Sequence, residues 1–274
     1  MSHIHIPDGV LPLVIWLPGW LLALALVTLA GRIAERSAVR RKVPLLAVAS
    51  ALMLVAMSTE IVPLAYHVNL TVIAGVLLGP VLSVIAAFIV EVVLAMLGHG
   101  GVTVLGLNTL MISTEMVLGW ALFRLFVRVL SRKRVRWAAF GATVLTLATT
   151  TTLLVGLVAL AGGGAATTRE TGALQPATMT FANPLTGGIV HTGLFSGGER
   201  SSAAGTASAA PAAGTLSVKR FAAVVYTLGP FGWLIEALIT AWVLGYIGRV
   251  RPSLLWEGVL KPHEIPLQDD KAAS

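Results

Sequence analysis

Long apolar stretches separated by short basic segments constrain this chain more than any other feature of its sequence. Each stretch is long enough to cross a hydrocarbon core of about 30 Å as a helix. Composition agrees, since 56% of the residues are hydrophobic and 11% are charged, against about 25% charged in a typical soluble domain. We therefore predict an all-α integral membrane protein with spans near residues 10–31, 43–66, 69–98, 103–130, 137–160 and 221–248.

The third stretch is too long for one crossing. As a single helix, Asn69 to Gly98 would extend about 45 Å. Gly79-Pro80 offers a natural break, because proline interrupts helical hydrogen bonding. Two short crossings here bring the total to about seven transmembrane helices. They also place the basic run 124–136 on the same side as the run 32–42.

Charge distribution predicts how the bundle is oriented. Eleven of the nineteen Lys and Arg residues lie in the two segments 32–42 and 124–136, and such loops face the cytoplasm. The N-terminus is then outside and the C-terminus cytoplasmic, although Lys219 and Arg220 fall on the outer side. His3, His5 and His67 all reach the outer face. Basic residues confined to such loops indicate no nucleic-acid partner.

These spans divide the chain into five parts. We predict a metal-binding segment at 1–9, a six-span membrane core at 10–160, a low-complexity extracytoplasmic loop at 161–218, a last transmembrane helix at 219–250, and a cytoplasmic tail at 251–274. The loop is rich in Gly, Ala, Thr and Ser and its charges cancel, which is typical of a mobile segment.

The N-terminal segment carries the strongest metal-binding pattern. His3 and His5 stand beside the chain terminus, and Pro7 with the Asp8-Gly9 turn stiffens the backbone before the first span. An amine at the chain terminus, backbone amides and a nearby imidazole form a nitrogen-rich set that suits Ni(II), Co(II) or Cu(II). With no cysteine in the chain, any metal is held by nitrogen and oxygen. The alternative is that both histidines are solvated tail residues.

Ionisable side chains inside spans are functional candidates because a buried charge is costly in a bilayer. They are Glu60, Glu91, Glu115 and Glu236. Glu60 lies about two turns before His67 in the expected helix, somewhat below it, where it could accept the imidazole N–H of a ligating histidine. The alternative for Glu60 is a protonated carboxyl between helices. For the other three glutamates, packing or subunit contact is favoured.

His99 and Asn108 are further candidates. His99 lies between glycines and Asn108 follows in the next span; either could orient a metal site or close a loop. Enzyme signatures are missing from the sequence: there is no phosphate-binding Gly-x-x-x-x-Gly-Lys-Ser/Thr run and no His-Glu-x-x-His. We therefore expect no enzymatic activity, no cofactor, and nucleotide hydrolysis on other subunits.

Several short motifs together resemble one membrane protein family. They are His-Ile-Pro-Asp-Gly at 5–9, Tyr-His-Val-Asn-Leu at 66–70, Leu-Leu-Gly-Pro at 77–80 and Gly-His-Gly-Gly-Val-Thr-Val-Leu-Gly-Leu-Asn at 98–108, with a looser match at 235–240. With these the chain resembles the CbiM/NikM family, the cobalt/nickel substrate-binding membrane component of energy-coupling-factor ABC transporters.

The resemblance implies a seven-helix component of a bacterial or archaeal cytoplasmic membrane. Its terminal amine, a backbone amide, the side chain of the second residue and a histidine after the second helix bind Ni(II) or Co(II), which is the transported substrate. The histidine after the second helix matches His67. By motif the N-terminal histidine is His5, but Met-Ser-His precedes it; if Met1 is removed, His3 follows the Ser2 amine and becomes the rival.

The resemblance also implies partners. They are an energy-coupling transmembrane subunit, two ATPase subunits and a possible small accessory membrane subunit, and the chain itself is surrounded by membrane lipid. Two other functions stay open on the sequence. One is a self-sufficient secondary transporter for divalent cations that uses the intramembrane glutamates. The other is an intramembrane metalloenzyme.

Overall fold

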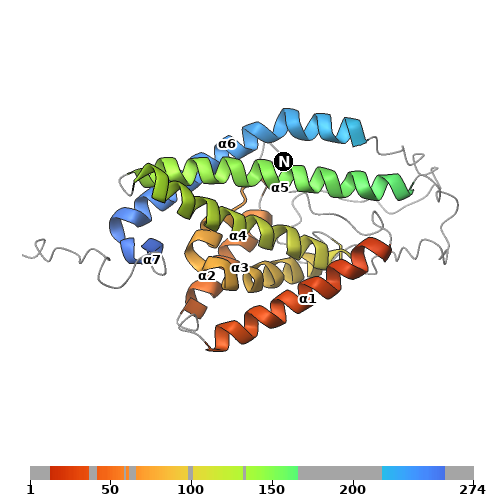
Figure 1. The fold of residues 1–274 in the computed structure, drawn as a ribbon, viewed down its shortest axis with the longest axis horizontal. Helices are drawn as coiled ribbons and strands as arrows, with labels where there is room; N and C mark the ends of the chain where they lie inside the picture. Colours follow the sequence, from red (N-terminus) through yellow and green to blue (C-terminus); the bar gives the residue numbers. More distant parts are fainter. Residues whose placement is uncertain are drawn as a thin grey trace, which may run out of the picture.

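A computed structural model describes residues 13–36, 42–58, 60–61, 66–97, 101–131, 134–165 and 218–256. Helices form nearly all of this part of the chain (Figure 1). They are α1 (Leu13–Arg36), α2 (Val43–Ser58), α3 (Thr71–Met96), α4 (Leu105–Leu130), α5 (Val135–Ala165), α6 (Val218–Val250) and α7 (Pro252–Trp256). Two two-residue strands, β1 (Glu60–Ile61) and β2 (Tyr66–His67), pair in an antiparallel manner.

Five of the helices are long and apolar enough to cross a membrane. They are α1, α3, α4, α5 and α6, while α2 is a shorter apolar helix of 16 residues. This result confirms the predicted all-helical membrane architecture. The predictions for residues 1–12 and 166–217 concern parts of the chain that lie outside the described residues.

Some predicted boundaries were wrong. The second span, expected to run to Tyr66, ends as a helix at Ser58 and is followed by β1 and β2. Pro63 lies between the strands in sequence and lacks the N–H that a helical hydrogen bond uses. It is a weak signal for the end of the helix, since Pro18 and Pro230 lie inside α1 and α6. At the other end of the chain, α7 occupies the start of the segment predicted as a polar tail.

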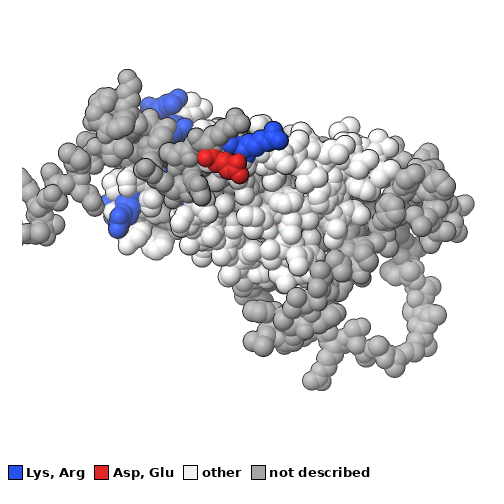
Figure 2. Space-filling model, turned by 90° about the horizontal axis from the view of Figure 1, so that it is seen from below, with Lys and Arg blue, Asp and Glu red and all other residues white. Residues whose placement is uncertain are grey.

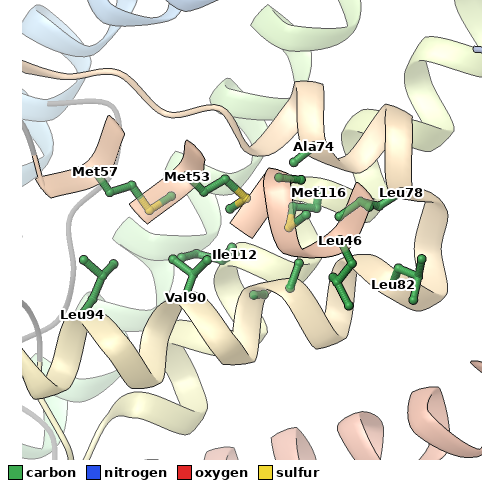
Figure 3. Close-up of a cluster of buried hydrophobic side chains, with 13 residues drawn as sticks. Leu46, Met53, Met57, Ala74, Leu78, Leu82, Val90, Leu94, Ile112 and Met116 are labelled. Carbon is green, nitrogen blue, oxygen red and sulfur yellow. The ribbon is translucent and has the colours of Figure 1, made fainter. Parts of the chain in front are cut away.

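The predicted break in α3 is confirmed. Gly79 has φ 78° and ψ 176°, which is outside helical space, and Pro80 follows it. Figure 3 shows the consequence: Ala74 and Leu78 lie on one limb, and the chain then reverses so that Leu82 and Leu94 lie on a second limb. The first limb is thus a short half-helix and the second is a longer one.

The helices share two ends. Leu46 lies near Leu82, and Met57 near Leu94, so α2 and the second limb of α3 run in the same direction (Figure 3). We call the end where α2 and α3 finish the hairpin end, because β1 and β2 follow α2 there. The opposite end, where α4 and α6 finish and α7 lies, we call the basic end (Figure 1).

The basic end carries the described Lys and Arg side chains. They lie at the end of α1, before α2, on the last turns of α4, at the start of α5 and after α6: Arg32, Lys42, Arg124, Arg128, Arg134, Arg136, Arg249 and Arg251. On the face in Figure 2, the charged side chains lie toward this end and the rest of the described surface is uncharged. The bundle is therefore polarised in the way that the sequence predicted.

Two large apolar clusters join most of the helices, and a smaller third one joins α1 to α4 and α5. One connects α2, α3 and α4 around Met53, Val90, Ile112 and Met116 (Figure 3). The other connects the first limb of α3 with α4, α5, α6 and α7 around Phe123, Ala139 and Leu244. Because α3 belongs to both clusters, the residues just before it are fixed against several helices at once.

Candidate metal-capture region

A short non-helical segment, Val68–Leu70, connects β2 to α3 and is held inside the bundle. Asn69 is only 3% exposed. In a hydrocarbon environment, non-helical backbone is tolerated only where protein groups or water satisfy its polar atoms. The hydrogen bonds of this segment therefore show what holds it in place.

Asn69 is bonded to two acidic side chains from different helices. Its backbone N–H donates to Glu236 Oε1 at 3.1 Å, and its Nδ2 donates to Glu115 Oε1 at 2.5 Å. Its own Oδ1 accepts from the backbone N–H of Thr71 at 3.2 Å. The residue thus ties α4 and α6 to the start of α3.

Glu115 is the centre of this network. Besides Asn69, it accepts from Thr71 Oγ1 and, at 3.1 Å, from Thr150 Oγ1 of α5. Glu115 and Glu236 are each 1% exposed, and Thr71 is fully buried. A carboxylate can accept from several donors at its two oxygens, so one side chain joins α3, α4, α5 and the segment before α3. We call Asn69, Thr71, Glu115, Thr150 and Glu236 the Asn69 network.

The Asn69 network lies near the middle of the bundle. Glu115 is ten residues after the start of α4, which corresponds to about 15 Å, or half of a 30 Å hydrocarbon core. Thr150 and Glu236 are also near the middle of their helices. The chain leading from the hairpin to α3 therefore enters the bundle to about half its depth.

The structure brings Glu60 and His67 together through strand register. The two residues are direct partners in the β1–β2 pair. This corrects the expectation that Glu60 lies two helical turns below His67, because the two residues face each other across antiparallel strands and do not share a helix. Residues opposite each other in an antiparallel pair are close neighbours along the backbone.

The predicted N-terminal donors Met1, Ser2, His3 and His5 lie outside the described residues, as does His99. The helix that follows the N-terminal donors begins at the hairpin end. Trp20 Nε1 of α1 donates to the carbonyl oxygen of Val102, just before α4, at 3.3 Å. Ile15 and Trp16 pack against Val104 and Leu154. The first described residues of α1 therefore lie at the end of the bundle where β2 and His67 lie.

Asn108 is buried on the first turn of α4, with 3% of its surface exposed. It is seven residues before Glu115, so the two side chains lie on one face of α4 about two turns apart. That position places Asn108 between the hairpin end and the Asn69 network. Glu91 is also buried, at 1% exposure, on the second limb of α3.

Among the described residues, no group of three or more His, Cys, Asp or Glu side chains is arranged to hold a metal ion. The Asn69 network has only two carboxylates, and Asn69 and two threonines use them as acceptors. It is built to hold a backbone segment. The predicted metal donors come instead from the hairpin and from residues preceding α1.

Sequence reasoning missed the Asn69 network, although it noticed both glutamates. Glu115 and Glu236 were assigned to packing or subunit contact, and the structure shows that both bond to Asn69. The available signal was the polar residue pattern Asn69-x-Thr71 directly after His67, in an otherwise apolar stretch. The sequence does not show that Asn69 bonds to Glu236 of α6, which is 167 positions away.

Comparison with known proteins identifies a related group. A protein-family model described as a cobalt uptake substrate-specific transmembrane region, CbiM, matches residues 5–254. A crystal structure of a truncated transition metal transporter matches with a TM-score of 0.62 and 17% sequence identity, covering 90% of this chain and 99% of that one. At this identity the likeness shows a common fold. No curated protein matches the chain by sequence.

Proposed function

The chain belongs to the CbiM family of cobalt uptake substrate-specific transmembrane proteins, and on that premise we propose that it captures Ni(II) or Co(II) for an ATP-driven uptake transporter. It is a multi-pass membrane protein of metal transport. In our proposal the ion binds at the hairpin end, on the outer surface of a bacterial or archaeal cytoplasmic membrane, and leaves at the basic end.

One observation carries this proposal. The start of α1, the β1–β2 hairpin and the ends of α2 and α3 share the hairpin end, while most basic residues gather at the other, Lys219 and Arg220 at the start of α6 being the exception. Basic residues favour the cytoplasmic side, so His67 and the segment carrying His3 and His5 face outward with the N-terminus. The broken α3 supplies two limbs in place of one crossing, which supports the seven-span, C-terminus-inside topology.

We propose that His67 and one of His5 or His3 supply imidazole nitrogens to the metal. An amine from Met1 or Ser2 and a backbone amide complete the nitrogen set, with Glu60 supporting the His67 imidazole. Nitrogen donors suit Ni(II) and Co(II), and the charge of the metal does not change during transport. The metal is the transported substrate, so no resident cofactor is needed.

The partners in this proposal are an energy-coupling transmembrane subunit and two ATPases, with an accessory membrane subunit where the system has one. Because the captured ion must be released inward, and no ATP-binding motif occurs in this sequence, the partners supply the energy. A secondary transporter is the second candidate, favoured by the two carboxylates of the Asn69 network near mid-membrane. It predicts uptake that needs no ATPase partner.

Equilibrium binding tests the capture site. Ni(II) and Co(II) affinities of the purified protein in detergent, with intact-mass measurement of its N-terminal residue, are compared for wild type and the His3→Ala, His5→Ala and His67→Ala variants. We expect His67→Ala and one N-terminal variant to lose tight binding. His263→Ala, which changes a histidine beyond α7 in the predicted tail, serves as the control and should bind normally. Unchanged affinity in all three site variants would refute the site.

Uptake measurements separate the two transport candidates. Radioactive nickel or cobalt uptake is followed in cells that express the chain alone, with its coupling subunit and ATPases, and with ATPases unable to hydrolyse ATP. The capture proposal expects uptake only with active ATPases. Full uptake by the chain alone, abolished by dissipating the proton gradient, would establish the secondary transporter instead.

A further inference from the structure

The Asn69 network holds the polypeptide immediately after His67 in a single position. Three hydrogen bonds involve Asn69, through its backbone N–H, its Nδ2 and its Oδ1. They reach α4, α6 and the first turn of α3. Asn69 is two residues after His67, so at about 3.3 Å per extended residue a fixed Asn69 confines the His67 backbone to within about 7 Å.

The network is more extensive than the fold requires at this point. The backbone N–H of Asn69 needs one acceptor, and Glu236 provides it. The further bonds from Asn69 Nδ2, Thr71 Oγ1 and Thr150 Oγ1 converge on Glu115. They restrict the Asn69 side chain and the direction in which the backbone enters α3. Metal sites need their ligands within about 0.5 Å of the productive geometry, which packing and supporting hydrogen bonds provide.

We propose that Asn69, Glu115 and Glu236 are positioning residues for metal capture: they preorganise the backbone that presents His67. The network orders this segment during folding, so metal binding does not have to order it. The same three residues connect the capture end to the middle of α4 and α6, the helices that continue to the basic end. The inference rests on the proposed function, in which His67 is a ligand.

The test compares metal binding in variants that change the network and leave every proposed donor in place. Asn69→Ala removes two of the three bonds. Thr150→Val removes one bond to Glu115 with little change of shape, and Glu236→Gln keeps an acceptor for the Asn69 N–H. We expect Ni(II) affinity to fall about 10- to 100-fold in Asn69→Ala, the usual effect of losing a supporting group, to fall less in Thr150→Val, and to be largely retained in Glu236→Gln.

Thr143→Val is the matched control. Thr143 lies two turns before Thr150 on α5, is also buried, and donates to a backbone carbonyl in its own helix. The single hydroxyl proton of Thr150 is shared between Glu115 Oε2 and the Thr146 carbonyl of its own helix, both at 3.1 Å. Only Thr150 reaches Glu115. The control variant should bind Ni(II) as wild type does, and the difference between the two valine variants isolates the bond to the network.

The ligand-field absorption of bound Ni(II) gives a readout that stability alone does not move. We expect the bands to shift or broaden in Asn69→Ala and Thr150→Val, and to stay unchanged in Thr143→Val. Size-exclusion chromatography identifies any variant that does not fold; if Asn69→Ala is lost, the comparison of Thr150→Val with Thr143→Val still decides the question.

Two results would overturn the inference while leaving the proposed function intact. In the first, His67→Ala loses Ni(II) but Asn69→Ala and Thr150→Val keep wild-type affinity and absorption. In the second, Thr143→Val is weakened as much as Thr150→Val. If instead wild type does not bind Ni(II) or Co(II), or His67→Ala binds normally, the proposed function itself fails.

Discussion

Replacing Gly75 by alanine should force α3 and α4 apart, because their backbones touch at this position. A Cβ added to Gly75 would lie 2.2 Å from the carbonyl oxygen of Met116 and 2.8 Å from its carbonyl carbon. Both atoms belong to the backbone of α4, so no side-chain rotation relieves the clash. Reaching an ordinary contact of 3.4 Å requires a separation of about 1.2 Å, the difference between 3.4 and 2.2 Å.

The expected loss of stability has two parts. Overpacking of this kind typically costs about 1–3 kcal/mol. Thr71 is one turn before Gly75, and Glu115 directly precedes Met116, so the same separation also breaks the bond from Thr71 Oγ1 to Glu115. A typical intramolecular hydrogen bond contributes about 0.5–1.5 kcal/mol. Together with about 1–3 kcal/mol for overpacking, the free energy of unfolding should fall by about 1.5–4.5 kcal/mol.

Reversible unfolding in mixed detergent micelles, followed by tryptophan fluorescence, measures this change. Gly31→Ala on α1 is the control, because a Cβ there meets nothing within 4 Å, and alanine is the better helix former by up to about 1 kcal/mol. It should leave stability unchanged or slightly raised. If Gly75→Ala were as stable as Gly31→Ala, α3 and α4 would not approach as closely as the structure shows, and the argument would be refuted.

Three further predictions concern the break, the basic end and the orientation. Gly79→Ala should lower the free energy of unfolding by about 1–3 kcal/mol, since Gly79 has φ 78° and ψ 176°, a backbone conformation that is essentially restricted to glycine; an unchanged unfolding curve would count against the break. The Arg124 guanidinium lies 4.2 Å from the centre of the Trp120 ring, so a double-mutant cycle with Arg124→Gln and Trp120→Leu should yield a coupling of about 0.5–2 kcal/mol, and a value near zero would contradict this contact. In this cysteine-free chain, an impermeant maleimide applied outside intact cells should label Leu160→Cys and spare Ser253→Cys, and the reverse pattern would invert the proposed topology.

Much of the fold follows from the sequence because apolar length and basic loops are local signals. The helices α4, α5 and α6 begin and end within a few residues of their predicted limits, and Gly79-Pro80 breaks α3 as expected. The end of α2 was missed because Pro63 is surrounded by apolar residues, so the run looked like a continuing span. The average hydropathy of a stretch of residues does not reveal a single proline, which has no backbone N–H to donate.

The candidate site was only partly predictable, for a different reason. The convergence of the start of α1 with His67 follows from counting crossings, which needs no knowledge of helix neighbours. The bonds from Asn69 to Glu115 and Glu236 depend on which helix faces meet, and a sequence of uniformly apolar helices does not specify that. Similarly, the register that pairs Glu60 with His67 depends on a hairpin that the sequence analysis treated as helix.

The free-energy cost of placing the Asn69 network inside a membrane is itself an argument for a role beyond packing. A helix that continued across the membrane from α2 would satisfy its own backbone, and it would need no help from α4, α5 and α6. This chain instead ends α2 early and carries a non-helical segment to mid-membrane, where each unsatisfied polar group would cost several kcal/mol. Glu236 and Glu115 then accept from the backbone N–H and the side chain of Asn69, and Thr150 donates to Glu115. Such an arrangement is expected where the segment must present a particular residue, and the residue at the outer end of this segment is His67.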